Sequence, residues 1–560
     1  MSDRTRRVPG RLARALAVTV LLSLGLAGCV GIPKSGGVNV GPPVLSANNG
    51  PPGADIPVSP PTGATKDEIL TDFMQAVVSP ENDYSIARQY LTQGADHSWD
   101  PTKSVLIREG SPDTESLPTG SMLYTVQTKA AIDVDGIYSE QNFDSSQVLS
   151  FSFKKVDKQW RISSLADGIV ISRDSFNNDF HEQTLYFFDP TFRYLIPDVR
   201  WFPTGSTVQT RVVSALLGGP SETMQGGVVV SAFPEGTKLQ KVVDLRSSTA
   251  TVDLSTDAAG QKPLAQSRML TQLQTSLSST SVTNVSISVG GAPLQIPQAA
   301  PATVALAVDP AALVRQGKKF GFAPRLDSIG KISAQVAAVD ASAVTLSRDQ
   351  SSAAALGKGG VYLLSDAASG ARLVDSRNGL IAPSIDPFGY VWSVPTNDPS
   401  NIRVTGANGK SLSVAAAVPR NSKVVALQVS HDGTRVLMYL KTTSAPRLVI
   451  IGVVRRGDVP TSLGVPIDLP VSSAVPIDAT WVDADSVAAL GRSGDAVTVT
   501  TYTIGGTAGD SSTTGDAVHI VGGSREDQLR VITSTGEVLQ LASSGWQETS
   551  ISASVLATQQ

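Results

Sequence analysis

The chain of 560 residues contains a single cysteine, Cys29, and its surroundings indicate what chemistry the thiol performs. Five arginines occur within the first 14 residues, and the run 15–27 is almost entirely small or apolar. That run is shorter than the roughly 20 residues of a membrane-spanning helix. A basic start with a short apolar core is typical of a secretory signal. The Cys29 thiol is the one side-chain nucleophile of this region that could carry a thioether-linked lipid.

The residues Leu26-Ala27-Gly28-Cys29 resemble a bacterial lipobox. The resemblance implies that residues 1–28 are a lipoprotein signal peptide, cleaved before Cys29. It also implies that Cys29 becomes an N-acyl, S-diacylglycerol cysteine. Several acyl chains anchor a protein firmly, because each buried methylene contributes about 0.8 kcal/mol. We therefore expect a lipid-anchored protein on the extracytoplasmic face of the cell membrane. A secreted protein with an incidental cysteine is the alternative interpretation.

The charge and composition of the mature chain exclude one class of partner. Removing residues 1–28 leaves 40 basic against 48 acidic side chains, a net charge of −8. A nucleic-acid binder would carry a basic patch, so we expect no nucleic acid as a partner. With one cysteine there is no internal disulfide, and stability must come from packed cores. Residues 29–64 are rich in Gly and Pro, which predicts an extended tether.

The segment 65–204 has the pattern of an α+β domain. Thr65 and Glu68 fit a capping box at the start of an amphipathic helix. Alternating strands follow, with a turn at Asp157-Lys158. This outline is similar to the cone-shaped fold of the nuclear-transport-factor superfamily, in which such cones serve mostly as packing or docking modules. The aromatic tract 185–190, continuing at 201–203, we interpret as an inter-domain seam.

A second α+β domain is expected at 205–300. The pieces 215–220, 233–237 and 252–255 resemble the turns and core positions of a GerMN domain, named for spore-germination lipoproteins. These positions indicate fold and not chemistry. Asp253 we expect to be a hydrogen-bond acceptor at a strand end and not an acid catalyst.

Residues 301–560 contain a weak repeat. Its marks are turn aspartates, each followed by a β-branched strand: Asp340, Asp386, Asp432, Asp483 and Asp527. They are 46, 46, 51 and 44 residues apart. Periods of 40–50 residues with several strands each are typical of propeller blades. We predict an all-β propeller of five or six blades, with two successive β-sandwiches as the alternative.

Patterns for catalysis, cofactors and metals do not assemble. The stretch Val404–Ser411 resembles a phosphate loop but lacks its first glycine and lies between strands, so a polar hairpin turn is the better interpretation. His181-Glu182 has no second histidine four residues on. The four histidines we expect in turns or on the surface: His97, His181, His431 and His519. We therefore predict no catalytic, cofactor or metal site, and no enzyme.

The order of lipobox, tether, cone-like domain, GerMN domain and propeller resembles the actinobacterial lipoprotein family LpqB. That resemblance implies a partner, the extracytoplasmic domain of a sensor kinase, MtrB. It also implies a function: modulation of signalling to the response regulator MtrA, and through it of cell-envelope homeostasis and division. The family brings no catalytic residues or cofactors.

Two alternatives remain at this stage. The first is a lipoprotein that binds cell-wall glycan (peptidoglycan) through the GerMN domain or through propeller tryptophans, Trp392, Trp481 and Trp546. For these tryptophans, blade packing is the stronger expectation. The second is a hydrolase in the cone pocket or the propeller channel, which requires clustered ionisable groups in one cleft.

Overall fold

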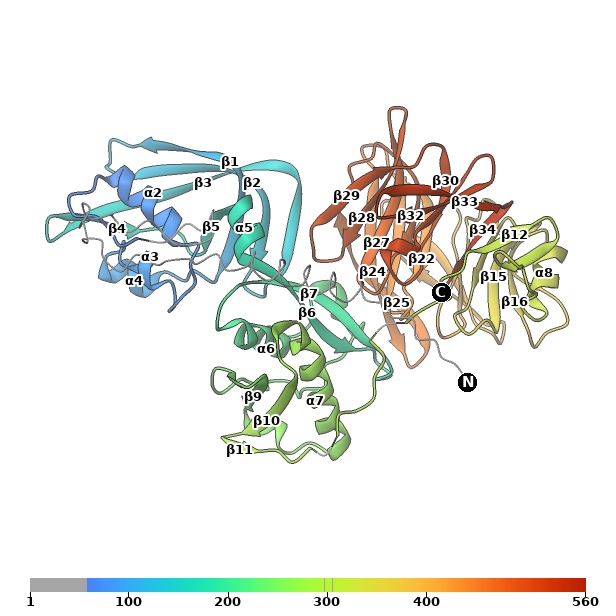
Figure 1. Cartoon of the computed structure of the whole chain (residues 1–560), viewed down its shortest axis with the longest axis horizontal. Coiled ribbons are helices and arrows are strands. Elements are labelled where there is room, and N and C mark those ends of the chain that lie inside the picture. Colours follow the sequence, from blue (N-terminus) through green and yellow to red (C-terminus); the bar gives the residue numbers. More distant parts are fainter. Residues whose placement is uncertain (1–57, 297, 305) are drawn as a thin grey trace, which may run out of the picture. The chain divides into compact units, whose positions relative to one another are not determined.

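The computed structural model describes residues 58–296, 298–304 and 306–560 (Figure 1). The predicted signal peptide, Cys29 and most of the predicted tether 29–64 lie outside these residues. In the part that is described, no helix has the length and apolarity to cross a membrane. Three units follow one another: two of mixed helices and strands, and one that is mainly strands with the short helix α8 (Ile332–Ala338). This confirms the predicted multidomain architecture.

The first unit places three helices against a five-stranded sheet. The helices are α2 (Lys66–Ala76), α3 (Ser85–Arg88) and α4 (Gln93–Ser98). The sheet has the order β4-β3-β2-β1-β5 and consists of β1 (Ser104–Ser116), β2 (Met122–Asp133), β3 (Tyr138–Val156), β4 (Gln159–Ser164) and β5 (Ile169–Ser172). Neighbouring strands are antiparallel except β1 and β5. The short helix α5 (Arg173–Asp179) follows β5.

Local signals in this unit act as the sequence predicts. The hydroxyl of Thr65 accepts a hydrogen bond from the Glu68 amide, and the Glu68 carboxylate accepts one from the Thr65 amide. The predicted capping box of α2 is therefore confirmed. Asp157 and Lys158 both have positive φ, as a two-residue hairpin turn between β3 and β4 requires. Phe73 of α2 packs against Phe151 of β3 in the core.

A long antiparallel hairpin, β6 (Phe180–Phe188) and β7 (Leu195–Pro203), contains the aromatic tract that we interpreted as a seam. Leu185 and Phe187 are fully buried in the core of the second unit. Phe180 belongs to the core of the first unit, and Trp201 packs against it. The hairpin thus contributes side chains to both cores, and the boundary expected at residues 204 and 205 falls just after it.

The second unit packs two helices on a four-stranded sheet. They are α6 (Val208–Gly218) and α7 (Pro263–Leu277), and the sheet has the order β11-β10-β9-β8. Its strands are β8 (Asp244–Arg246), β9 (Thr249–Leu254), β10 (Asn284–Val289) and β11 (Ala292–Pro293). Strands β9 and β10 are parallel, and α7 crosses between them with Met269 and Leu273 fully buried. The arrangement is a βαβ crossover next to a short hairpin.

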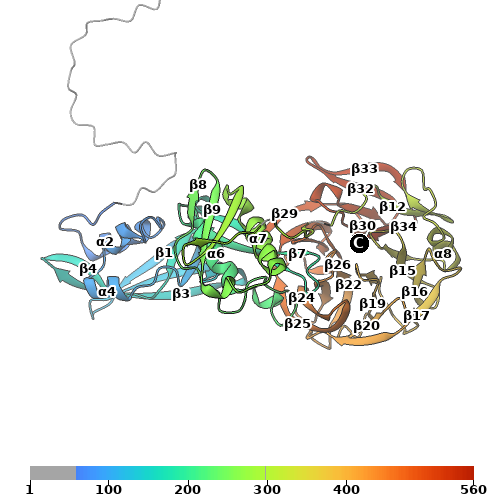
Figure 2. The ribbon, with the colours of Figure 1, turned by 90° about the horizontal axis from the view of Figure 1, so that it is seen from below.

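The third unit is a propeller of six blades, which confirms the predicted fold and fixes the blade count (Figure 2). Blades 2 to 5 are consecutive antiparallel sheets of four strands, and the four antiparallel strands of blade 1 belong to a larger sheet of seven strands. Blade 1 consists of β14 (Ala343–Leu346), β15 (Ser352–Gly357), β16 (Gly360–Ser365) and β17 (Arg372–Asp375). Blade 2 consists of β18 (Ser384–Ile385), β19 (Val391–Ser393), β20 (Asn401–Thr405) and β21 (Ser411–Ala415). Blade 3 consists of β22 (Lys423–Val429), β23 (Arg435–Lys441), β24 (Arg447–Arg456) and β25 (Val459–Leu469).

The remaining blades close the ring. Blade 4 consists of β26 (Val475–Trp481), β27 (Ser486–Ser493), β28 (Ala496–Thr503) and β29 (Ala508–Thr513). Blade 5 consists of β30 (Ala517–Val521), β31 (Arg530–Thr533), β32 (Glu537–Ala542) and β33 (Gly545–Ser552). Blade 6 joins both ends of the propeller segment, because β12 (Leu313–Gln316) pairs on one side with β13 (Lys319–Phe322) and on the other with the last strand, β34 (Val555–Gln559). Strand β34 also runs parallel to β14, so the ring is closed by hydrogen bonds between blades 6 and 1.

Candidate functional site

The propeller channel has two ends, which we name by the strands around it. At the turn end, the first strand of each of blades 1 to 5 runs into its second strand. At the open end, these first strands begin. Cys29, the one residue predicted to be modified, lies outside the described residues, so the lipidation of Cys29 stays a prediction. The candidate site within the described residues is therefore the propeller, and its turn aspartates are considered first.

Four of the five repeat aspartates lie at the turn end. Asp386 lies between β18 and β19, Asp432 between β22 and β23, and Asp483 between β26 and β27. Asp527 lies in a short 3-10 helix, η4 (Glu526–Gln528), between β30 and β31, where it is paired with Arg525. The repeat therefore marks the same structural position in blades 2, 3, 4 and 5.

For the first blade the predicted aspartate is wrong. Asp340 precedes β14 and forms an ion pair with Arg315, at 2.7 Å between Oδ1 and Nη2. The residue at the turn position is Asp349, whose carboxylate accepts hydrogen bonds from the Ser347 hydroxyl (2.6 Å) and the Ser351 amide (3.1 Å). The mistake arose because Asp340 also precedes a β-branched strand, and only strand pairing separates the two positions.

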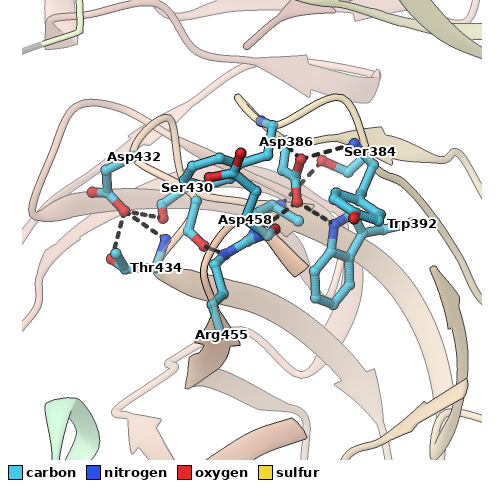
Figure 3. A network of polar contacts seen from close by, with 12 residues as sticks. Ser384, Asp386, Trp392, Ser430, Asp432, Thr434, Arg455 and Asp458 are labelled. Atoms are coloured by element: carbon cyan, nitrogen blue, oxygen red, sulfur yellow. Dashed lines mark hydrogen bonds and ion pairs between the residues drawn. The ribbon is translucent and has the colours of Figure 1, made fainter. Parts of the chain in front are cut away.

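Asp386 is the centre of a buried polar network (Figure 3). Its Oδ1 accepts hydrogen bonds from the amides of Phe388 (3.0 Å) and Tyr390 (2.9 Å). Its Oδ2 accepts from Trp392 Nε1 (3.0 Å) and from Arg455 Nη2 (2.7 Å). Asp386 and Arg455 have side-chain exposures of 0% and 2%. A charge pair so deeply buried requires these hydrogen bonds on its remaining atoms, and it has them.

Asp432 and Asp483 hold their turns in the same way. Asp432 accepts from the Ser430 hydroxyl (2.7 Å) and the Thr434 amide (2.8 Å), with Arg435 Nη2 at 3.2 Å. Burial alone would raise the pKa of Asp432, but Arg435 and these hydrogen bonds outweigh it and lower the pKa. Asp483 Oδ1 accepts from the amides of residues 485 and 486.

One carboxyl beside these turns is perturbed in the opposite direction. Burial and the neighbouring Asp483 raise the pKa of Asp485 to about 7, against a smaller opposing effect of Arg435. Asp485 also accepts a hydrogen bond from the Ser486 hydroxyl at 3.1 Å. A raised carboxyl pKa occurs in catalytic sites, but structural networks of charges produce it too. Asp485 lines a small cavity together with His431, Asp432 and Asp483, and the carboxylate of Asp483 is part of the turn that Asp485 belongs to.

The other candidate residues have structural roles as well. Asp253 lies near the end of β9, on the face opposite the core residues Val252 and Leu254. It accepts from the Ser288 hydroxyl (2.9 Å) and the Gly291 amide (2.8 Å), which confirms the predicted strand-end acceptor. These bonds lower the pKa of Asp253. The stretch Val404–Ser411 forms the hairpin between β20 and β21, as predicted.

The tryptophans are packing residues. Of the two interpretations, blade packing and a carbohydrate groove, packing was the stronger expectation. Trp392 and Trp481 are 0% and 1% exposed, so neither presents a ring to a ligand. Trp546 is partly buried, and its indole donates to the Ser512 hydroxyl at 2.8 Å. A glycan site built on these rings therefore has no stacking surface at Trp392 or Trp481.

The histidines divide into two groups. His97 and His181 are exposed, as predicted. His431 lies in the β22–β23 turn but is buried, and burial lowers its pKa. The prediction is wrong for His519, which lies within strand β30 and whose Nδ1 is hydrogen-bonded to Asp478 of the neighbouring blade. Among the described residues, no group of three or more His, Cys, Asp or Glu side chains is arranged to hold a metal ion.

The Asp478–His519 pair was missed from the sequence. Burial opposes protonation of the imidazole, but the Asp478 carboxylate outweighs it and raises the pKa of His519. Asp478 also accepts from the amides of Ala479 (2.9 Å) and Ile520 (3.0 Å). The two residues are 41 positions apart and on different blades, so no local pattern links them.

Family models match three successive parts of the chain. Residues 59–177 match "Lipoprotein LpqB, N-terminal domain", residues 184–295 match "Sporulation and spore germination", and residues 328–554 match "Lipoprotein LpqB beta-propeller domain". These three ranges correspond to the three folded units described above.

Curated proteins named Lipoprotein LpqB are similar to this chain. The relative from Nocardia farcinica is 33% identical over 225 residues, which is 39% of this chain and 36% of the relative. The one from Mycobacterium tuberculosis is 28% identical, over 38% of this chain and 36% of the relative. The alignments to the first relatives thus span about a third to a half of their length. The one from Streptomyces coelicolor is 27% identical over 527 residues, 82% of this chain and 83% of the relative.

Two similar solved structures are TolB from Acinetobacter baumannii and the first GerMN domain of GerM from Bacillus subtilis. The TolB match has 14% identity and a TM-score of 0.31 over 38% of this chain and 55% of TolB. The GerMN match has 20% identity and a TM-score of 0.18 over 22% of this chain and 96% of that domain. With all three units matched by family models, and one relative aligned along most of both chains, this chain belongs to the LpqB lipoprotein family.

Proposed function

We propose that this protein is a lipid-anchored accessory protein on the extracytoplasmic face of the cell membrane. In this proposal it binds the extracytoplasmic domain of a sensor kinase of the MtrB–MtrA type. It thereby modulates a two-component signal that controls cell-envelope homeostasis and division, and it performs no catalysis of its own.

The observation that carries the proposal is that the turn carboxylates of the propeller are bonded to the protein itself. Those of Asp386, Asp432 and Asp483 accept hydrogen bonds from their own turns, and Asp386 is neutralised by Arg455. Groups that hold turns in this way give a rigid platform with loops at its edge, which is the common design of binding modules. Membership of a lipoprotein family supports the anchor at Cys29.

The anchor supplies the energetic basis of the proposal. Confinement to a membrane raises the effective concentration of the protein around a receptor in the same membrane, so a weak contact suffices. Such a contact changes kinase activity only if the affinity for the two signalling states of the kinase differs. We therefore expect a modest affinity in solution and a larger effect on the membrane.

The decisive experiment separates confinement from folding. Cys29→Ala is expected to release the protein from the membrane and to weaken kinase output, while the purified domains keep their circular dichroism spectrum. An unrelated transmembrane anchor fused to the Cys29→Ala chain is the matched control, and we expect it to restore output. In-cell cross-linking of the native protein should capture the kinase. Normal output from the released Cys29→Ala protein would contradict the proposal.

Cell-wall glycan binding is the second candidate. Trp392 and Trp481 do not support it, but a hydroxyl-lined cavity at the open end of the channel does. Retention of the protein on purified peptidoglycan would support this candidate, and free passage would reject it.

A further inference from the structure

The open end of the propeller channel contains a cavity of about 1090 Å³. Its walls come from the strand starts of blades 1 and 5, from the β31–β32 turn and the end of β33 in blade 5, and from the loop before blade 2. The closing blade completes them where β34 begins beside the β12–β13 turn. Ligand sites for small molecules usually have volumes of about 300–1,000 Å³. The cavity is therefore large enough for a ligand of several rings.

The lining that the described residues give this cavity is polar, and its one titratable side chain is already paired. Serine and threonine supply seven of its side chains, and Gln316 adds an amide. Of the described residues that line it, His519 is the only one with a titratable side chain, and its imidazole is already hydrogen-bonded to Asp478. An ionic ligand would lose hydration here without meeting a free counter-charge. The lining therefore favours a neutral ligand.

The hydroxyl groups of the lining present acceptors. Ser342 donates its hydroxyl to the Leu356 carbonyl (3.2 Å), Ser554 donates to the Arg315 carbonyl (3.1 Å), and Ser534 donates to the Asp516 carboxylate. A hydroxyl has one proton and two lone pairs, so each of these oxygens keeps acceptor capacity after its proton is used. A ligand that matches them must bring several donors, and the hydroxyl groups of a sugar do so without charge.

Apolar side chains complete the match. Val518 is 48% exposed and lines the cavity together with the side chains of Ala382 and Ile532. A saccharide has C–H faces between its hydroxyl groups, so it can use both kinds of surface. A polyamine would also bring donors, but the lining offers no free carboxylate among its side chains to neutralise it.

We propose that the open end of the propeller channel binds a short neutral saccharide. Its hydroxyl groups donate to the oxygens of Ser342, Ser534 and Ser554, and its C–H faces lie against Val518. The lining comes from the first, fifth and sixth blades together. A bound saccharide therefore bridges the closure of the ring between β34 and β14, and it stabilises the closed propeller by mass action. This proposal does not depend on the kinase contact.

The test uses the full mature chain and a panel of neutral trisaccharides: maltotriose, cellotriose and chitotriose. Spermine and citrate serve as the cationic and anionic probes. Binding is measured by saturation-transfer NMR and by the shift of the thermal unfolding midpoint. We expect at least one trisaccharide to bind and to raise the midpoint, and we expect no effect of spermine or citrate.

Two variants locate the site. Val518→Trp fills the cavity and is expected to weaken trisaccharide binding by about tenfold or more, which corresponds to 1.4 kcal/mol or more. The matched control is Val465→Trp on β25, an exposed valine outside the lining, which should bind as the native chain does. Ser554→Ala removes one acceptor and should weaken binding by about two- to tenfold, the range of one hydrogen bond.

Each contrary result overturns the proposal. These results are no binding of any trisaccharide at millimolar concentration, binding of spermine or citrate in its place, or equal binding by the native chain and Val518→Trp. The kinase is absent from this experiment. A failure to bind saccharide therefore leaves the cross-linking test of the proposed function unaffected.

Discussion

The two ends of the propeller channel use polar side chains for opposite purposes. At the turn end, Asp386 accepts four hydrogen bonds, and all of them come from the protein itself. The last two residues, Gln559 and Gln560, are also buried there and accept from the Asp309 amide and the Ser384 hydroxyl. At the open end, the hydroxyl groups of Ser342 and Ser554 donate to backbone carbonyls, and both residues line a cavity.

The difference teaches how to separate structural from functional polar residues when neither kind forms a catalytic motif. A buried charge whose bonding capacity is used by the protein is part of the fold, and its removal leaves other groups unsatisfied. A neutral oxygen with unused lone pairs beside an open cavity costs the fold little and remains available to a ligand. The carboxylates attract attention in the sequence, but the hydroxyl groups are better placed to recognise something.

The largest effect is expected at the turn end, for Asp386→Ala. This change leaves the Arg455 guanidinium buried without its partner, and it removes the acceptor of Trp392 Nε1 and of two turn amides. Breaking a buried ion pair from one side costs about 3–5 kcal/mol. We expect a loss of that size in the free energy of unfolding of the propeller, measured by urea denaturation with tryptophan fluorescence.

The control for Asp386→Ala comes from the open end. Ser554→Ala removes a hydroxyl that donates to the Arg315 carbonyl, a group that also accepts from the Ser554 amide (2.9 Å). Its denaturation midpoint should stay close to that of the native chain. If the two variants lost equal stability, the proposed division between the two ends would be wrong.

Much of the turn end was predictable from the sequence. An aspartate that caps its own turn finds its hydrogen-bond partners among neighbouring residues. The repeat of Asp386, Asp432 and Asp483 is therefore visible in the sequence. The same local pattern occurs before β14, and for that reason it selects Asp340, whereas the structure places Asp349 in the turn after β14. The capping box at Thr65 and the turn at Asp157-Lys158 were readable for the same reason, because each is a local feature.

The open end was not predictable, because its parts are distant in the sequence. Blade 6 combines β12 and β13 with β34, so no single repeat unit contains it. The cavity lining comes from several blades, and each contributes residues without a distinctive pattern of its own. Whether a side chain is buried also depends on the neighbouring blades of the assembled ring. For this reason the sequence predicts a packing role for Trp392 but does not show that its ring is buried.

The second prediction concerns pH, and it uses the Asp478–His519 pair beside the cavity. The Asp478 carboxylate raises the pKa of His519, so this pair adds stability below the ordinary histidine pKa of about 6.5. That contribution is lost as the pH rises through the higher pKa of the folded state. We expect His519→Gln to flatten the fall in the thermal unfolding midpoint between pH 6 and pH 9. His97→Gln, in an exposed helix, is the control and should leave the curve unchanged; an identical curve for both variants would argue against the pair.

The smallest effect tests which aspartate holds the first turn. Burial opposes ionisation of Asp349, but hydrogen bonds from Ser347 and Ser351 lower its pKa, so its contribution is present at neutral pH and is lost as the pH falls through the lowered pKa. Asp349→Ala removes the acceptor of the Ser351 amide and of two hydroxyl groups. A net hydrogen bond contributes about 1 kcal/mol, which sets the expected loss in the free energy of unfolding at pH 7.

Asp340→Ala breaks only an ion pair with one exposed partner and should change the urea midpoint less than Asp349→Ala does. The reverse order of the two midpoints would mean that the repeat does run through Asp340, and that the turn of blade 1 is held differently from the turns of blades 2 to 4.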